Sequence, residues 1–350
     1  MTDAVRIART VPGWLRPADD GDDRIALASR VRLARSLAGT RFRRSLGRPE
    51  QNEVVARVLD ACTDTLPWDD PLHVQVHRLG PANRGLLPER QLCSRELADA
   101  KHPTGLHASD DGLLAVMANE EDHVRLQSLA PGLDLSAALA AAVATDRRLD
   151  RRLGWAVHPG LGHLTACHTN VGTGMRASVM LHLPALAETG ELKAVLQGAA
   201  KLGLAVRGRQ GEGSEPGGHV YQLSNLRSLG RSEDQLCAEV ADAARAVVLA
   251  ERLARAALLA ARVRLEDRVF RAWGVLTGAR ILAGDEAFEQ LGWLRVGRSL
   301  DLIPVPWEVL DRLWIQIQPH HLQALHKEAA ETGPRDRIRA RLVRDSLKPF

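Results

Sequence analysis

The segment 164–181, with the sequence LTACHTNVGTGMRASVML, brings a cysteine, a glycine loop and an arginine close together in the chain. Glycine lets a backbone approach a ligand closely, and the planar guanidinium of Arg176 can donate two parallel hydrogen bonds to a phosphate. Cys167 could act either as a reactive thiolate or as a small buried apolar residue. These residue types fit the handling of a phosphorylated ligand, although VGTG alone is a weak signal.

More arginines stand beside expected strand ends or glycine loops, where functional residues gather. They are Arg30 and Arg32 in ASRVRLAR, Arg125 in EDHVRLQ, and Arg207 at the start of RGRQGEGSE. Residues i and i+2 of a strand face the same side, so Arg30 and Arg32 can converge on one anion. A single arginine of this kind is better explained as a solvated surface residue, and only the whole set favours an anion site.

Two acidic clusters could hold a cationic group. NEEDH offers Glu120, Glu121 and Asp122 at an expected hairpin tip, and GEGSE offers Glu212 in a glycine-rich loop. Carboxylates bind a planar guanidinium in a bidentate manner. Taken alone, however, NEEDH is better explained as an ordinary polar turn.

These residues must be positioned by a mixed α and β part followed by a helical part. Apolar alternation predicts strands at 72–79 and 162–167, a hairpin over 112–129, and a strand, glycine-rich loop and strand over 202–225. Helices are expected at 49–65, 134–154, 176–186, where Pro184 would stop the helix, and 232–273, where Ser232 and Gln235 form a capping box.

Composition shifts suggest three units. Residues 1–23 are polar and rich in Pro, Gly and Asp, and we expect a flexible N-terminal arm there. Residues 24–254 carry the mixed pattern, whereas 255–350 are almost wholly helical and end in a strongly basic segment.

Bulk composition narrows the class of protein. The chain has 350 residues and a formal net charge of +4, a mild excess that permits anion binding without requiring nucleic acid. The 4 cysteines form no C-x-x-C pair, which disfavours a disulfide framework or structural zinc. No secretory signal or membrane span is recognisable, so a cytoplasmic, soluble protein is expected.

Taken together, ASRVRLAR, NEEDHVRLQ, LTACHTNVGTGMRASVMLHLPAL, RGRQGEGSE and YQLSN resemble the ATP:guanido phosphotransferases in order and spacing. RLEDRVFRAWGVL and RDRIRA resemble the C-terminal region of the bacterial protein-arginine kinases, McsB type. The resemblance runs from about residue 24 to the end. It implies an α+β fold, in which a curved antiparallel sheet flanked by helices forms a catalytic domain at 24–254, followed by a smaller all-helical regulatory domain at 255–350.

The resemblance also implies roles for individual residues. ATP, with Mg²⁺ held mainly by the nucleotide and no protein metal ligands, would be bound by Ser29, Arg30, Val31, Arg32, Arg125, Arg176, Ala177, Ser178, Val179, Met180, Arg207, Gly208 and Gly211. Glu121 and Glu212 would hold the acceptor guanidinium and take its proton, with Cys167 beside it. Arg335, Asp336, Arg339 and Ala340 would bind phosphoarginine at a regulatory site, although this segment by itself reads as an exposed basic helix.

Three residues depart from the family pattern. His168 stands where proline is usual, and Ala28 where a second serine is frequent. Glu96 stands about where related kinases place a nucleotide-contacting histidine, so its carboxylate either points away or weakens ATP binding.

The implied function is phosphorylation of protein arginines, which would mark the modified proteins for stress-response regulation or degradation. Implied partners are protein substrates with accessible arginines, a transcriptional repressor among them, a zinc-containing activator protein, a Clp-type chaperone and a second copy in a homodimer, with no direct nucleic acid and no membrane. Two alternatives stay open, namely a kinase of free arginine or another small guanidino compound, and a non-catalytic phosphoarginine-binding adaptor.

Overall fold

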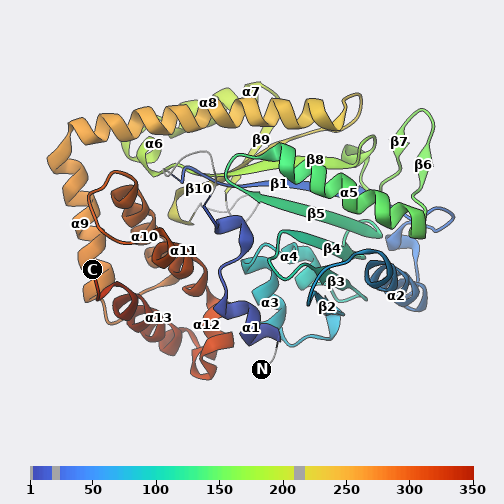
Figure 1. Ribbon diagram of the computed structural model, residues 1–350, viewed down its shortest axis with the longest axis horizontal. Helices are drawn as coiled ribbons and strands as arrows, with labels where there is room; N and C mark the ends of the chain where they lie inside the picture. The colour runs from blue at the N-terminus through green and yellow to red at the C-terminus, as the bar shows by residue number, and fades with distance from the viewer. Residues whose placement is uncertain (1–2, 18–23, 209–216) are drawn as a thin grey trace.

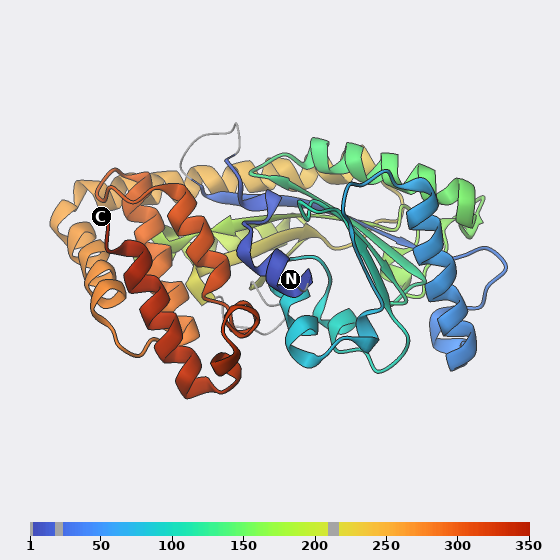
Figure 2. The same cartoon turned by 60° about the horizontal axis from the view of Figure 1, so that its bottom comes forward.

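The protein is described by a computed structural model that covers residues 3–17, 24–208 and 217–350. Within these residues the centre is an eight-stranded antiparallel sheet with the order β2-β3-β4-β5-β1-β8-β10-β9. Figure 2 shows its strong twist. The strands are β1 (Ala26–Arg35), β2 (Leu72–Val74), β3 (Gly105–Ala108), β4 (Leu114–Ala118), β5 (Val124–Pro131), β8 (Met175–His182), β9 (Leu204–Gly208) and β10 (Val220–Asn225). A separate small hairpin joins β6 (Val157–His158) to β7 (Gly162–His163).

One face of the sheet is covered by helices and holds the main hydrophobic core. The long helices on this face are α2 (Arg48–Thr65), α5 (Leu135–Leu153) and α8 (Glu233–Ala260), with α8 lying along the upper edge in Figure 1. The short helices α6 (Pro184–Thr189) and α7 (Leu192–Lys201) lie beside α8. On the other face, α1 (Asp3–Arg9), α3 (Pro81–Glu89) and α4 (Arg95–Ala98) form a second core with the strands β2 to β4. The rest of that face remains open for a site.

Residues 176–186 do not form the single helix that the sequence predicts. Met175–His182 form the strand β8, which lies between β1 and β10, and the helix α6 begins only at Pro184. Ala177, Val179 and Leu181 are buried in the core on one face of the strand. A central strand with one face packed in the core and the other face partly covered carries few polar residues. Its hydrophobic pattern therefore resembles that of a buried helix.

Smaller differences occur elsewhere. The strand expected at 72–79 stops at Val74 and is followed by a 3-10 turn, and the strand expected at 162–167 contains only the two residues of β7. The helix expected at 232–273 breaks at Ala261, where α8 ends and α9 (Arg262–Gly278) begins. Residues 3–17, within the expected flexible arm, instead form α1 and a 3-10 turn in which Trp14 and Leu15 are buried.

Other expectations are confirmed by the structure. The helices expected at 49–65 and 134–154 correspond to α2 and α5, and the hairpin over 112–129 corresponds to β4 and β5. β9 and β10 are the strands expected on either side of the glycine-rich loop. Ser232 and Gln235 form the expected capping box at the start of α8.

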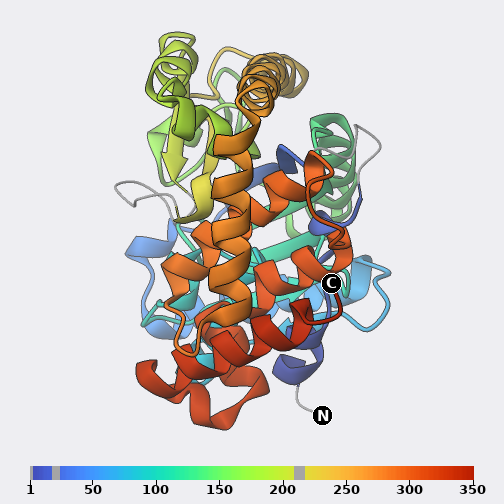
Figure 3. The ribbon, with the colours of Figure 1, turned by 90° about the vertical axis from the view of Figure 1, so that its left-hand side faces the viewer.

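The C-terminal part is a cluster of helices at one end of the sheet (Figures 1 and 3). It consists of α9, α10 (Gly284–Ser299), α11 (Trp307–Gln316), α12 (Pro319–Leu325) and α13 (Thr332–Leu347). The expected fold class, an α+β domain with a curved antiparallel sheet followed by a smaller helical part, is therefore confirmed. Among the helices described here, none is both apolar and long enough to cross a lipid bilayer.

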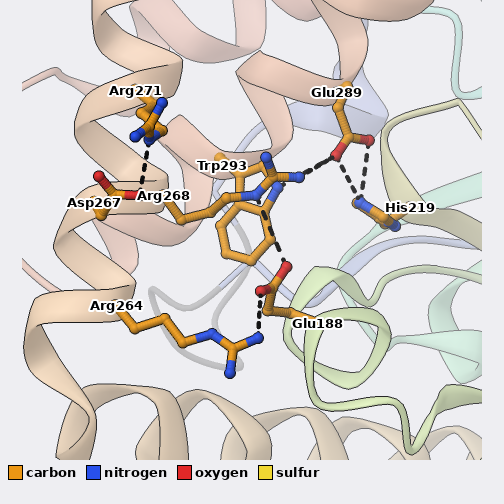
Figure 4. A network of polar contacts seen from close by, with 8 residues as sticks. All are labelled: Glu188, His219, Arg264, Asp267, Arg268, Arg271, Glu289 and Trp293. Carbon is orange, nitrogen blue, oxygen red and sulfur yellow. Dashed lines mark hydrogen bonds and ion pairs between the residues drawn. The ribbon is translucent and has the colours of Figure 1, made fainter.

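Charged residues join the helical cluster to the sheet domain near the end of the glycine-rich loop (Figure 4). Arg268 of α9 lies over the indole ring of Trp293 and donates to Glu289 at 3.0 Å. The Glu289 carboxylate also accepts from His219, which directly precedes β10. The hydrogen bond from His219 outweighs burial and lowers the pKa of Glu289. The start of β10 is therefore attached to α9 and α10.

A second junction is made by the carboxylate of Glu89 at the end of α3. It accepts four hydrogen bonds, from the backbone N–H and the ring Nδ1 of both His320 and His321, over 2.7 to 3.0 Å. Burial would raise the pKa of Glu89, but the hydrogen bonds from the two histidines prevail and lower it to about 2. Glu89 therefore anchors α12 to the sheet domain.

We expect Glu89→Gln to lower the free energy of unfolding by about 1–3 kcal/mol at neutral pH. The glutamine amide has only one acceptor oxygen, so some of the four donors of His320 and His321 lose their acceptor. The pKa of Glu89 falls on folding from an ordinary 4.5 to about 2, so the carboxylate stabilises the protein above about pH 4.5. This contribution is lost as the pH falls toward 2. Urea unfolding at several pH values should therefore show the two proteins converging at low pH. Glu53→Gln, at an exposed position of α2, is the control.

Candidate active site

A cavity of about 450 Å³ opens on the uncovered face of the sheet. Its cationic wall comes from four strands, with Arg32 on β1, Arg125 on β5, Arg176 on β8 and Arg207 on β9. The complete lining is Arg32, Ala34, Arg43, Arg44, Glu96, His102, Glu120, Glu121, Arg125, Cys167, Thr169, Asn170, Gly174, Arg176 and Arg207. The cavity therefore brings together four of the five predicted arginines, Glu121 and Cys167, whereas Arg30 is absent from its lining.

Strand register explains how arginines distant in sequence become neighbours. Arg32 of β1 is opposite Arg176 of β8, and Arg30 is opposite Ser178, so these side chains share one face of the sheet. Arg30 donates to the side-chain oxygen of Gln91 at 3.1 Å. The Nε of Arg32 is buried and has no hydrogen-bond partner within the described ranges.

The crowding of guanidinium groups shifts their ionisation. Burial, followed by the charges of Arg176 and Arg125, lowers the pKa of Arg30 to about 10. Burial and then the charges of Arg30 and Arg125 lower the pKa of Arg32 well below its ordinary value. Like charges held together in this way are stabilised when a polyanion binds among them. The wall is therefore suited to the phosphates of a nucleotide.

The acidic side of the cavity comes from the hairpin between β4 and β5. Glu120 is buried and pairs with Arg125 at 2.7 Å, whereas Glu121 is 3.4 Å from the same guanidinium and its side chain is 32% exposed. The backbone oxygen of Glu121 also accepts from Arg43 at 3.4 Å. Glu120 is thus engaged in holding Arg125, and Glu121 is the carboxylate that can reach a ligand.

Cys167 lines the cavity from the loop that precedes β8. Its Sγ lies 3.1 Å from the hydroxyl oxygen of Thr169, and its side chain is partly exposed. The neighbouring His168 is exposed and does not line the cavity. His168, which stands where the family usually has proline, therefore takes no part in lining the cavity.

Several residues assigned to ATP by resemblance do not bring their side chains to this cavity. Ser29 is buried on the helix-covered side, where its hydroxyl donates to the oxygen of Gly132 and accepts from the N–H of Asp134. Val31, Ala177 and Val179 are buried, and they are absent from the cavity lining because they alternate with its arginines along β1 and β8.

The remaining assigned residues lie nearby or cannot be placed. Ser178 and Met180 alternate with the core residues of β8, on the face that carries Arg176, but do not line the cavity. Gly208 ends β9. Gly211 and Glu212 lie outside the described residues, so the predicted pairing of Glu212 with Glu121 remains a prediction.

The structure adds lining residues that the sequence analysis did not propose. Arg43 and Arg44 come from the turn after β1, and His102 follows α4. RFRRS carries no signal that distinguishes it from a solvated basic turn. Glu96 also faces the cavity rather than pointing away, so its negative charge is close to the cationic wall.

Sequence comparisons identify the fold and its chemistry. The ATP:guanido phosphotransferase C-terminal catalytic domain matches residues 53–254, more than half of the chain, and the protein-arginine kinase McsB C-terminal domain matches residues 262–350. The chain belongs to the ATP:guanido phosphotransferase family. A protein-arginine kinase of Symbiobacterium thermophilum is 37% identical over 97% of this chain and 98% of that protein. A protein-arginine kinase of Moorella thermoacetica is 40% identical over 95% of this chain and 97% of that protein.

Solved structures of guanido phosphotransferases share the fold. The duplicated taurocyamine kinase from Schistosoma mansoni with bound transition state analog components has a TM-score of 0.57 and 25% identity, and the match covers 69% of this chain and 36% of that chain. Lombricine kinase has a TM-score of 0.59 at 21% identity, with 71% of each chain covered, and shows the fold alone.

The motif RDRIRA lies on α13, in the part that matches the McsB C-terminal domain. Arg339 is 2% exposed, donates to the backbone oxygens of Ile317 and Leu282 at 2.8 Å each, and also pairs with Asp336. Ala340 is buried, and Arg335 donates to the hydroxyl of Thr332. Arg339 therefore joins α13 to the end of α11, and only part of the motif is exposed, in contrast to the exposed basic helix that the residues alone suggest.

Proposed function

We propose that this protein is a kinase that transfers the γ-phosphoryl group of ATP to arginine side chains of proteins. The observation that carries the proposal is the cavity itself, in which four arginines from separate strands lie beside Glu121 and Cys167. Support also comes from relatives named protein-arginine kinases that match nearly the whole chain, and from the McsB-type C-terminal part.

In this proposal Arg32, Arg125, Arg176 and Arg207 bind the phosphates of ATP. Phosphoryl transfer needs in-line placement and neutralisation of the charge that spreads over the transferred group. Guanidinium groups arranged before the reaction supply both, because their dipoles and charges need no reorganisation when the transition state forms. The ion pair between Glu120 and Arg125 holds one of these arginines in place.

Mg²⁺ would enter with the nucleotide, since it favours phosphate and water oxygens over a cage of protein ligands. When bound, Mg²⁺ neutralises part of the phosphate charge. Among the residues described, no three His, Cys, Asp or Glu side chains are grouped so that they could hold a metal ion. We therefore assign no protein ligand to it.

On the acceptor side, Glu121 would bind the arginine guanidinium, orient the attacking nitrogen and accept its proton as the new N–P bond forms. The acceptor has a pKa above 12 and no free lone pair before it loses a proton, so a positioned carboxylate is required. We propose Glu212 as the second carboxylate. Cys167, which also lines the cavity, would contribute negative character beside the guanidinium.

A kinase of a small guanidino compound is the second candidate. It is favoured by one observation, the structural likeness to taurocyamine kinase, whose name denotes a small-molecule acceptor. The relatives that match nearly the whole chain are instead named for protein arginine.

Mass spectrometry under non-acidic conditions decides between these candidates. The protein is incubated with ATP and Mg²⁺ and either a folded arginine-containing protein or free arginine. Acid-labile phosphate on arginine of the protein acceptor is the expected result. Transfer to free arginine alone would favour the small-molecule kinase, and modification confined to serine or threonine would refute both.

Finer assignments follow the same proposal. We propose that Arg335 and Asp336 contribute to a phosphoarginine-binding regulatory site, with Arg339 and Ala340 forming its buried support. The support is the match of residues 262–350 to the McsB C-terminal domain and the position of the motif on α13. Action in the cytoplasm, a homodimer, and contacts with a repressor, a zinc-containing activator and a Clp-type chaperone belong to the same proposal.

A further inference from the structure

Asp122 is a buried carboxylate beside the cavity that the mechanism above does not use. It directly follows Glu121 in the hairpin between β4 and β5 and is only 1% exposed. Its Oδ1 accepts a hydrogen bond from the backbone N–H of Ala166 at 2.5 Å and another from the hydroxyl of Ser36 at 3.4 Å. Its Oδ2 is buried with no hydrogen-bond partner among the residues that the structure describes.

The hydrogen bond to Ala166 joins two walls of the cavity. Ala166 immediately precedes Cys167, and Asp122 immediately follows Glu121. The hydrogen bond therefore joins the two segments at positions adjacent in sequence to these two cavity residues. The Cys167 segment is further ordered by the Thr165 hydroxyl, which donates to the Cys167 oxygen at 2.8 Å. The Asp122 carboxylate therefore links the segment that carries Glu121 to the segment that carries Cys167.

The neighbours of Asp122 in the same hairpin form hydrogen bonds with other segments around the cavity. The Nδ1 of His123 accepts from the N–H of Leu37 at 3.1 Å, and its Nε2 donates to the oxygen of Arg41 at 2.9 Å. That segment leads directly to Arg43 and Arg44 of the cavity. The side-chain nitrogen of Asn119 donates to the oxygen of Gln51 at 2.8 Å. Residues 119–123 thus act as the frame on which the surrounding loops are fixed.

We propose that Asp122 is a positioning residue for phosphoryl transfer, whose ionised carboxylate holds the Cys167 segment against the hairpin and so places Cys167 relative to Glu121. The inference rests on the proposed assignment of Glu121 and Cys167 to the active site. It concerns a residue that does not touch the reacting atoms and acts through the Ala166 amide.

The electrostatics separate this role from a purely structural one. Burial raises the pKa of Asp122 from 3.8 to about 6, against the opposing hydrogen bond from Ala166 and the charge of Arg125. The charged groups that face it are Glu120, Glu121, Arg125 and Arg43. A pKa raised by folding means that stability falls as the pH rises through about 6, where the carboxylate ionises in the folded protein. Stability at neutral pH therefore favours a neutral side chain at this position.

The test compares Asp122→Asn with the matched control Asp111→Asn in the full chain. Asp111 also accepts from a backbone N–H, that of Leu113, and from a serine hydroxyl, that of Ser109, but lies in a turn outside the cavity lining. Four quantities are measured: kcat and KM for arginine phosphorylation between pH 5 and 8, the melting temperature, and the rate of alkylation by iodoacetamide. Of the 4 cysteines, Cys167 alone is partly exposed, so alkylation reports on that residue.

For Asp122→Asn we expect kcat to fall by about 10²-fold, because small misplacements of groups around reacting atoms have effects of this order. KM for ATP should change little, and the melting temperature should stay the same or rise, because a neutral side chain replaces a buried charge. Cys167 should be alkylated faster because its segment is released. In the wild type, kcat should fall on the acid side with an apparent pKa near 6, and this limb should be absent in the variant. Asp111→Asn should match the wild type in rate and alkylation.

Two results would overturn the inference. One is an Asp122→Asn protein with the kcat, pH profile and alkylation rate of the wild type. The other is an Asp122→Asn protein that melts well below the wild type, since the carboxylate would then serve stability. A wild-type protein that phosphorylates no arginine would instead contradict the proposed function, while the alkylation rates would still report on the contact between Asp122 and the Cys167 segment.

Discussion

Replacing Glu121 with glutamine should lower kcat for arginine phosphorylation by at least about 10²-fold, the usual range for a positioned general base. The amide keeps the size of the side chain and can still contact the acceptor, but it cannot take the proton that the attacking nitrogen must lose. KM for ATP should change little, because the arginine wall is intact. The fold should be retained, since Arg125 keeps its shorter ion pair, with Glu120 at 2.7 Å.

Steady-state kinetics with a protein acceptor measure this effect, and a thermal melt checks the fold. Glu191→Gln, at an exposed position outside the cavity, is the control and should behave as the wild type. A Glu121→Gln protein with wild-type kcat would remove Glu121 from the mechanism and leave the acceptor side to the loop between β9 and β10.

Truncation of Arg32 to alanine has the second large effect, on the nucleotide side. We expect kcat/KM for ATP to fall by about 10³-fold or more, because a guanidinium on a transferring phosphoryl group is worth 10³–10⁵-fold in comparable enzymes. The ligand-free protein should melt at the same or a higher temperature than the wild type. Burial and the charges of Arg30 and Arg125 lower the pKa of Arg32, which shows that the folded protein disfavours its charged form.

The two effects are separated by recording melting temperatures with and without Mg²⁺ and ATP, together with kinetics. Ligand should raise the melting temperature of the wild type, as binding to the native state requires, and raise that of Arg32→Ala much less. Arg152→Ala is the control, because Arg152 is exposed and pairs only at the surface with Asp64. Unchanged affinity of Arg32→Ala for ATP would contradict the assignment of the arginine wall to phosphate binding.

The residues of the candidate active site are more predictable from the sequence than the helices and strands on which they lie. The alternation of ASRVRLAR places Arg30 and Arg32 on one face of a strand, and the structure has this arrangement in β1. By contrast, the composition of RASVMLHL predicts a helix but the segment forms β8, and Arg176 on this strand lines the cavity. A guanidinium beside a glycine loop is informative in either conformation, whereas an apolar central strand and a buried helix share the same composition.

Alternation also explains why some candidate residues are absent from the cavity lining. A motif names consecutive residues, but a strand sends their side chains to opposite faces. Arg30 and Arg32 therefore face the open side while Ser29 and Val31 enter the core. Similarly, RDRIRA reads as exposed and basic, yet the helical period turns Arg339 inward to the backbone oxygens of Ile317 and Leu282.

The sequence by itself determined the residue types of the site, the family, and the division into a mixed part and a helical part, because these depend on composition and local spacing. Only the tertiary structure decided which arginines meet, that Glu120 is committed to Arg125 while Glu121 stays accessible, and that Asp122 is joined to Ala166. Those contacts depend on the register of strands far apart in the chain and on the face that the helices cover. Neither is encoded in any short stretch of residues.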